Sequence, residues 1–206
     1  MASFAERCGV HVAARQQVLA RTTQIINSTG LELVRFNWCD LHGITRGKTL
    51  VAAAAAKAMQ TGVGMVSTLM LKDTSDRTAF KVFEPGGTAA LPGFGQANNL
   101  MLVADPASFK QLPWAAGTGW VQCQPWFQDG TPVELDTRRV LQRALARLAE
   151  AGYAMQCGLE VELHIYRITD DTAAMDPSLA AWPGLPPEVA LIHPGYNLLT
   201  EGWYDM

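Results

Sequence analysis

Hydrophobic and polar residues alternate most clearly over residues 155–166. Six apolar residues fall on one face of an extended strand, and polar and acidic residues fall on the other. On the polar face Glu160 and Glu162 point the same way, about 7 Å apart at a rise of ~3.3 Å per residue. We expect the apolar face to be buried. The acidic face is either a solvated strand surface or half of a divalent-metal site, because neighbouring carboxylates resist joint ionisation without a compensating cation.

The pattern elsewhere predicts helices that alternate with short strands. Apolar residues at three- and four-residue spacing predict a helix over residues 10–27 that Gly30 would end, and an alanine-rich run predicts a second helix over residues 52–60. Residues 31–38 alternate in polarity and residues 44–50 return after a turn at Gly43, so we expect a β-hairpin. Further strands are expected over residues 63–71, 78–83, 100–104 and 120–127, and a long loop over residues 84–96.

A third helix is expected after Asp136 or Thr137, either of which could cap it. Apolar residues line one face of this helix, and arginines occupy the side that we expect to face solvent. The apolar residues are Val140, Leu141, Ala144, Leu145 and Leu148, and the arginines are Arg138, Arg143 and Arg147.

The order of these helices and strands predicts an α+β protein. Two to four strands packed against one or two helices make a small domain, and breaks at Pro106 and Pro113 place its end near residue 112. We therefore predict an N-terminal helix in residues 1–30, a first domain in residues 31–112 and the beginning of a second domain in residues 113–206.

The composition excludes several classes of protein. The chain has 206 residues, of which 49% are hydrophobic and 17% charged, and its net charge of −3 gives no footprint for nucleic acid. The longest apolar run, residues 50–56, is too short for a membrane helix, and the N-terminus lacks the apolar run of a secretory signal. Four dispersed cysteines form no C-x-x-C pair. We expect a cytoplasmic protein with free thiols that binds neither nucleic acid nor membranes.

Five separated motifs, in this order, resemble those of the glutamine synthetase family. Each motif alone is weak, but five in register span about residues 31–206 and make the resemblance specific. The motifs are W-C-D-L-H-G-I-T-R-G-K at residues 38–48, the segment 99–105 with L-P-W at residues 112–114, D-G-T-P at residues 129–132 with R-R-V-L at residues 138–141, G-L-E-V-E at residues 158–162, and G-Y-N-L-L at residues 195–199.

The resemblance implies a β-grasp-like N-terminal domain followed by the first part of a glutamine-synthetase-type catalytic domain. It implies a ligase that uses ATP as co-substrate and joins the γ-carboxylate of glutamate to ammonia or another amine through a γ-glutamyl phosphate. Glu160 and Glu162 would each bind a different one of two Mg²⁺ or Mn²⁺ ions, since hard cations prefer carboxylate and phosphate oxygens. Besides glutamate and the amine, the implied partners are further copies of the chain in a homo-oligomer with intersubunit active sites.

Asp40 matches the family's ammonium-site aspartate, a catalytic residue that the N-terminal domain delivers into a neighbouring subunit's site. Its carboxylate would bind the ammonium cation and help to remove a proton. The residues also fit a simpler alternative, a hairpin-turn aspartate that accepts hydrogen bonds from its own backbone. Arg46 and Lys48 leave two interpretations open as well. With Gly47 they form a motif typical of relatives that use amines other than ammonia, and they equally fit the exposed face of a strand.

Two features limit what the resemblance implies. Asn99 and Ala104 stand where the family usually has aspartate and proline, so this segment departs from the pattern. The matched portion is less than half of a typical family member, so we expect a fragment or a truncated member that is inactive in isolation. A non-catalytic assembly module or a pseudoenzyme is the alternative, and the chain does not reveal which amine a ligase would accept.

Overall fold

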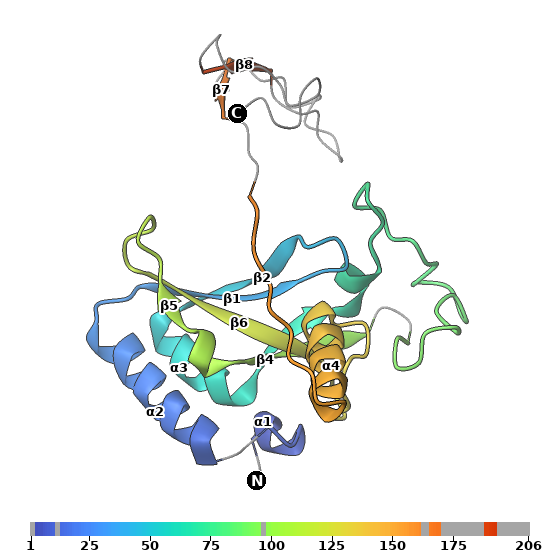
Figure 1. Cartoon of the computed structure of the whole chain (residues 1–206), viewed down its shortest axis with the longest axis horizontal. Coiled ribbons are helices and arrows are strands. Elements are labelled where there is room, and N and C mark those ends of the chain that lie inside the picture. Colours follow the sequence, from blue (N-terminus) through green and yellow to red (C-terminus); the bar gives the residue numbers. More distant parts are fainter. Residues whose placement is uncertain (1–2, 11–12, 96–97, 162–164, 170–187, 193–206) are drawn as a thin grey trace. The chain divides into compact units, whose positions relative to one another are not determined.

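The structure, a computed structural model, describes residues 3–10, 13–95, 98–161, 165–169 and 188–192 (Figure 1). Their contacts divide the chain into two units, Met1–Ala154 and Met155–Met206. The predicted α+β class is confirmed by the mixed sheet and its helices. No helix in these ranges is long and apolar enough to cross a membrane.

A mixed sheet forms the centre of the first unit, with the strand order β2-β1-β6-β4-β3 (Figure 1). The pairing of β1 with β6 is parallel, whereas β1–β2, β6–β4, β4–β3 and β5–β6 are antiparallel. Strand β6 therefore joins the two halves of the sheet. The strands are β1 (Leu33–Cys39), β2 (Thr45–Val51), β3 (Val63–Val66), β4 (Asn99–Ala104), β5 (Lys110–Gln111) and β6 (Thr118–Phe127).

The predicted hairpin is confirmed as the β1–β2 pair. Val34, Phe36 and Trp38 of β1 are fully buried, as alternation along the strand predicts, and Trp38 lies opposite Arg46 of β2. A Cβ at Gly47 would overlap the carbonyl oxygen of Phe36, so a larger residue at this position would push the two strands apart.

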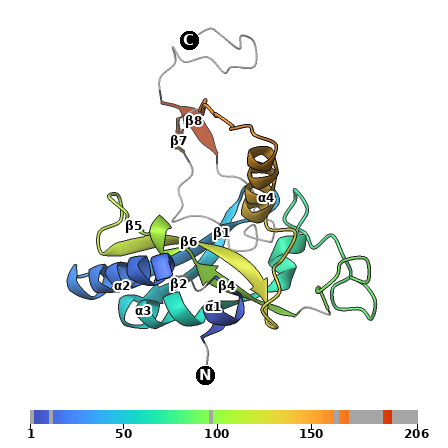
Figure 2. The same ribbon diagram turned by 60° about the horizontal axis from the view of Figure 1, so that its bottom comes forward.

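Helices α2 (Ala13–Ser28) and α3 (Ala52–Thr61) lie on one face of the sheet (Figure 2). Both helices were predicted, and Gly62 ends α3 by donating its N–H to the carbonyl of Ala58. Leu19, Ile26 and Met59 from the two helices belong to the same buried cluster as the apolar residues of β1. A short helix, α1 (Phe4–Arg7), packs in a second cluster with Trp126 of β6. Burial of these side chains is the main stabilising contribution to the unit.

The segment between β3 and β4 departs from the prediction. Only Val63–Val66 of the expected strand over residues 63–71 is extended, and it runs into a 3₁₀-helix, η1 (Ser67–Leu71). The strand predicted over residues 78–83 is absent, because Thr78 forms only an isolated bridge with Lys72 and the following residues turn repeatedly. Residues 84–95 form the expected loop. A second 3₁₀-helix, η2 (Pro106–Ser108), follows β4.

Helix α4 (Thr137–Glu150) begins where the sequence predicts, and Arg143 and Arg147 are exposed as predicted, but the apolar face is not buried. Asp136 caps it by accepting a hydrogen bond from the N–H of Arg139 at 3.2 Å. The apolar face is exposed, with Val140 53% and Leu141 52% accessible. Instead, Arg138 forms an ion pair with Asp105 at 2.6 Å. Polar contacts of the first turn therefore fix the rotation of the helix.

The strand predicted over residues 155–166 is not formed over residues 155–161. Residues 155–161 have no regular secondary structure, and Met155, Leu159 and Val161 are exposed rather than buried. A strand requires hydrogen-bonding partners, and the described strands pair elsewhere. The second unit instead contains an antiparallel pair, β7 (Tyr166–Ile168) and β8 (Val189–Leu191).

The domain limits that we expect at residues 30 and 112 are not tested by the structure and remain predictions. Strand β6, which follows the second limit, pairs with β1 and β4, and the contacts of the described residues divide the chain after Ala154.

Candidate functional site

Asp40 directly follows β1 and begins the turn into β2. Its Oδ1 accepts hydrogen bonds from the backbone N–H groups of His42 and Ile44, each at 2.9 Å. The turn is completed at Gly43, whose φ of 78° favours glycine. These contacts are the hairpin-turn geometry that the sequence also allowed, and they leave the Asp40 side chain 2% exposed.

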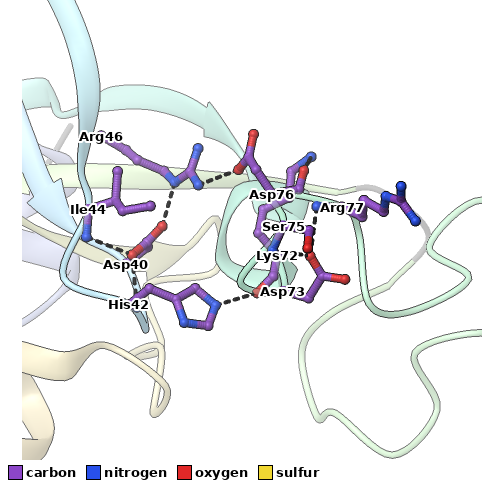
Figure 3. Close-up of polar contacts among 9 residues, drawn as sticks. All are labelled: Asp40, His42, Ile44, Arg46, Lys72, Asp73, Ser75, Asp76 and Arg77. Carbon is purple, nitrogen blue, oxygen red and sulfur yellow. Dashed lines mark hydrogen bonds and ion pairs between the residues drawn. The ribbon is translucent and has the colours of Figure 1, made fainter. Parts of the chain in front are cut away.

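Arg46 of β2 holds the other oxygen of this carboxylate (Figure 3). Its Nε donates to Oδ2 of Asp40 at 2.7 Å, and its Nη2 donates to Oδ1 of Asp76 at 2.5 Å. His42 adds a second link to the same loop, because its Nε2 lies 2.8 Å from the carbonyl oxygen of Lys72. The hairpin and the loop after η1 are therefore joined by side chains from both.

The loop after η1 is held by its own hydrogen bonds. Oδ1 of Asp73 accepts from the backbone N–H groups of Ser75 and Arg77, each at 2.9 Å. Lys72 donates from Nζ to the carbonyl oxygen of Asp76 at 3.1 Å. Asp76 has a φ of 57°, a conformation uncommon for residues other than glycine, asparagine and aspartate. This loop presents the Asp76 carboxylate to Arg46.

The contacts determine the charge state of the site. Burial alone would raise the pKa of Asp40, but hydrogen bonds from Arg46 and from the backbone N–H groups of His42 and Ile44 outweigh it and hold the pKa below its ordinary value. Burial alone would lower the pKa of Arg46, but its hydrogen bonds to Asp40 and Asp76 raise it. Asp40 and Arg46 are therefore both charged at neutral pH.

Of the two predicted metal ligands, Glu160 alone lies in the described residues. Glu160 is exposed and lies outside regular secondary structure, and Glu162 lies outside the described residues. Within the described ranges, no group of three or more His, Cys, Asp or Glu residues could hold a metal ion. A carboxylate oxygen suits Mg²⁺ or Mn²⁺, but Glu160 alone does not make a site for ions that take about six oxygen ligands.

Sequence reasoning missed Asp76 and described Arg46 incompletely. Asp76 is in the segment K-D-T-S-D-R, which has the composition of any exposed loop, and nothing local indicates its contact with β2. Arg46 is largely shielded and paired with Asp40, so it is neither an exposed strand residue nor free to bind a ligand. Lys48 is exposed, as expected if it lies on the solvent face of the strand.

A hollow of the described surface lies away from this network. It has a volume of about 1010 Å³ and is lined by side chains of α1, α2 and α3, but not by Asp40, Arg46 or Asp76. We take the polar network around Asp40 as the candidate site, because it holds this predicted site residue in a largely shielded ion pair.

No protein-family model matches the sequence. Among characterised proteins, gamma-glutamylanilide synthase of an Acinetobacter species is 32% identical over 198 residues, which cover 93% of this chain and 38% of that protein. Gamma-glutamylethanolamide synthetase of Streptomyces coelicolor is 41% identical over 70 residues, or 34% of this chain and 15% of that protein. Glutamine synthetase of Pyrococcus horikoshii is 23% identical over 142 residues, or 66% of this chain and 26% of that protein. The chain thus spans less than two fifths of each relative's length.

Proposed function

Because the chain is, over most of its length, a relative of the glutamine synthetase family and of γ-glutamyl-amine ligases, we propose that it forms part of an ATP-dependent ligase that joins the γ-carboxylate of glutamate to an amine. The observation that carries this proposal is the 32% identity to gamma-glutamylanilide synthase over 198 residues. The chain spans 38% of that relative, so the complete activity is proposed for a protein with further sequence, and we expect the 206-residue chain alone to be inactive.

In the proposed reaction, ATP phosphorylates the γ-carboxylate of glutamate and the amine displaces phosphate. Asp40 is the proposed catalytic residue. Its lowered pKa keeps the carboxylate ionised at neutral pH, which supports the binding of a cation and makes the group a weak proton acceptor. The β-grasp-like N-terminal domain and a homo-oligomer whose subunits share active sites are proposed on the same relationship.

Glu160 and Glu162 are the proposed ligands for Mg²⁺ or Mn²⁺. The support is the chemistry of the donors and the G-x-E-x-E motif around them. In a complete ligase, divalent ions would neutralise charge that develops on the transferred phosphoryl group.

The test uses a chimaera in which this chain replaces the matching segment of gamma-glutamylanilide synthase. Phosphate release from ATP and glutamate is measured with ammonia, an alkylamine, ethanolamine and an aromatic amine. We expect amine-dependent phosphate release from the chimaera and none from the 206-residue chain alone. A folded chimaera that releases no phosphate with any amine, while the parent enzyme is active, would contradict the ligase proposal.

The same chimaera tests the metal ligands. Glu160→Ala and Glu162→Ala should each reduce metal-dependent phosphate release by at least about a hundredfold. Loss of a residue that only hydrogen-bonds to a metal ligand already reduces metal affinity or activity by about 10–100-fold, and loss of a ligand should cost more. Glu150→Ala, which removes an exposed carboxylate of α4, is the matched control and should leave the rate unchanged. If the Glu160 and Glu162 variants turn over like the control, the assignment is wrong.

A non-catalytic assembly module is the second candidate. It is favoured by one observation, that both oxygens of Asp40 accept hydrogen bonds within the chain. Under this alternative Asp40→Asn would leave phosphate release by the chimaera unchanged.

A further inference from the structure

The guanidinium of Arg46 lies between two carboxylates that come from different segments (Figure 3). Asp40 belongs to the hairpin turn, and Asp76 belongs to the loop after η1. The contacts of 2.7 Å to Asp40 and 2.5 Å to Asp76 are those of charge-assisted hydrogen bonds. Arg46 thus stands where a cation bound by the two acids would stand.

The three side chains are largely shielded from water. Their exposed fractions are 2% for Asp40, 15% for Arg46 and 25% for Asp76. Lys72, the other cationic side chain of this network, donates to the backbone carbonyl of Asp76 rather than to a carboxylate. Among the described residues, Arg46 is the cation that forms an ion pair with Asp40. A free cation can pair with Asp40 only by displacing this guanidinium, because both carboxylate oxygens already accept hydrogen bonds and the side chain is shielded from water.

The chemistry of ligation gives this arrangement a consequence for the amine. The nitrogen lone pair attacks the carbonyl carbon of the γ-glutamyl phosphate and forms the C–N bond. The C–O bond to phosphate breaks, phosphate leaves with the bonding electrons, and the nitrogen loses one proton to a water molecule acting as base. An ammonium ion must lose an additional proton before it can attack, and a free carboxylate promotes this step. An aromatic amine is a weak base that is already uncharged at neutral pH.

We propose that Arg46 is a specificity-determining residue, which fills the cation position of Asp40 and thereby selects a weakly basic, uncharged acceptor such as an aromatic amine over the ammonium ion. The proposal rests on the ligase function proposed above. Removal of the guanidinium opens a position for a small cation between Asp40 and Asp76.

The first experiment uses the 206-residue chain and requires no catalysis. Thermal unfolding of the wild type, Arg46→Ala and Arg46→Lys is measured in sodium chloride and in ammonium chloride of equal concentration. In sodium, Arg46→Ala should lower Tm by on the order of 5–10 °C, because it leaves a buried carboxylate unpaired. Ammonium at about 0.2 M should raise the Tm of Arg46→Ala by about 2–4 °C above its value in sodium.

The wild type and Arg46→Lys, which keep a covalently attached cation, should show no difference between ammonium and sodium. Arg143→Ala is the matched control, because Arg143 pairs with Glu134 on the surface and its side chain is 64% exposed. An equal response to ammonium in wild type and Arg46→Ala, or no response in either, would overturn the proposal. If Arg46→Ala does not fold, Arg46→Gln takes its place with the same expected response to ammonium, because it removes the positive charge beside Asp40 and keeps much of the side-chain volume.

The second experiment uses the chimaera and compares kcat/KM for ammonia and for an aromatic amine. Arg46→Ala should raise the ratio of ammonia to aromatic amine by at least about tenfold, and Arg46→Lys should restore the original ratio. Equal loss with both amines means that Arg46 is only structural. A chimaera without activity toward any amine contradicts the ligase function, and the thermal experiment still decides whether Arg46 fills a cation position.

Discussion

Asp40 shows how one side chain can satisfy two interpretations. Its position after β1 and before Gly43 is visible in the sequence, so a turn aspartate could be predicted together with the family role. The partner Asp76 could not be predicted, because its contact with Arg46 depends on the path of the loop after η1. The geometry shows that Asp40 stabilises the turn, and its catalytic role stays a prediction.

The ion pair of Asp40 predicts a specific loss of stability. Asp40→Ala should lower the free energy of unfolding by about 3 kcal/mol, because it leaves the partly buried Arg46 and two backbone N–H groups without their acceptor. Urea unfolding of the 206-residue chain measures this change. Asp129→Ala, which removes an exposed turn aspartate, is the control and should cost less than about 1 kcal/mol. Equal losses in the two variants would contradict the argument.

The low pKa of Asp40 adds a dependence on pH. Because the folded-state pKa lies below the unfolded value of about 3.9, the ionised group stabilises the fold above that value, and this stability is lost as pH falls through the folded pKa. The stability difference between wild type and Asp40→Asn should be constant above about pH 5 and shrink toward about pH 3. A difference that grows on acidification would contradict the assignment.

Helix α4 shows what amphipathicity can and cannot predict. The spacing of its apolar residues identified the helix and its cap, because both signals are local. The burial expected for the apolar face was wrong, because burial depends on the neighbours of the helix and not on the spacing of its own residues. The contacts of Thr137 with the carbonyl of Cys39 and of Arg138 with Asp105 anchor the first turn of the helix. The strand expected over residues 155–166 failed for a similar reason, since an alternating pattern does not supply a pairing partner.

The cap of α4 combines a favourable hydrogen bond with an unfavourable charge. Burial raises the pKa of Asp136 despite its hydrogen bond from the Arg139 N–H and the nearby Arg139 and Arg138 charges. A raised folded-state pKa means that stability is fully present below the unfolded value of about 3.9 and is lost as pH rises through the folded pKa. At pH 7, Asp136→Asn should therefore be at least as stable as wild type, whereas Asp136→Ala should lose about 1 kcal/mol with the cap.

Thermal unfolding at pH 4 and pH 7 distinguishes the two effects at Asp136. Wild type should gain stability relative to Asp136→Asn on acidification, because the buried carboxylate becomes protonated. If Asp136→Asn is as destabilised as Asp136→Ala at pH 7, the carboxylate charge is favourable and the argument is wrong.

For the chain as a whole, the sheet joins segments whose pairing could not be predicted from the sequence. Neighbouring strands such as β1 and β2 were predicted because a short turn connects them. The parallel pairing of β1 with β6 was not predicted, since Leu33 and Thr118 are far apart and many partners fit an alternating strand. The extent of the first unit, Met1–Ala154, follows from this long-range pairing and from the contacts of α4 with the sheet.

This organisation predicts that residues 1–154 fold without the second unit. A chain that ends at Ala154 should unfold cooperatively, with a Tm within about 3 °C of the 206-residue chain, because all six strands of the main sheet are retained. Far-ultraviolet circular dichroism measures the transition. A chain that ends at Ala116 lacks β6 and should show no cooperative transition. If both truncated chains behave alike, β6 is not the strand that holds the sheet together.

The central position of β6 also has a consequence for synthesis of the protein. Strand β1 leaves the ribosome about 85 residues before its parallel neighbour, which takes on the order of ten seconds at typical rates of translation. During this interval β1 has only β2 beside it, and an isolated two-stranded hairpin is marginally stable in water. The open edge of β1 is meanwhile able to pair with other chains. The native sheet is therefore completed only after β6 has been synthesised, and until then the edge of β1 stays open.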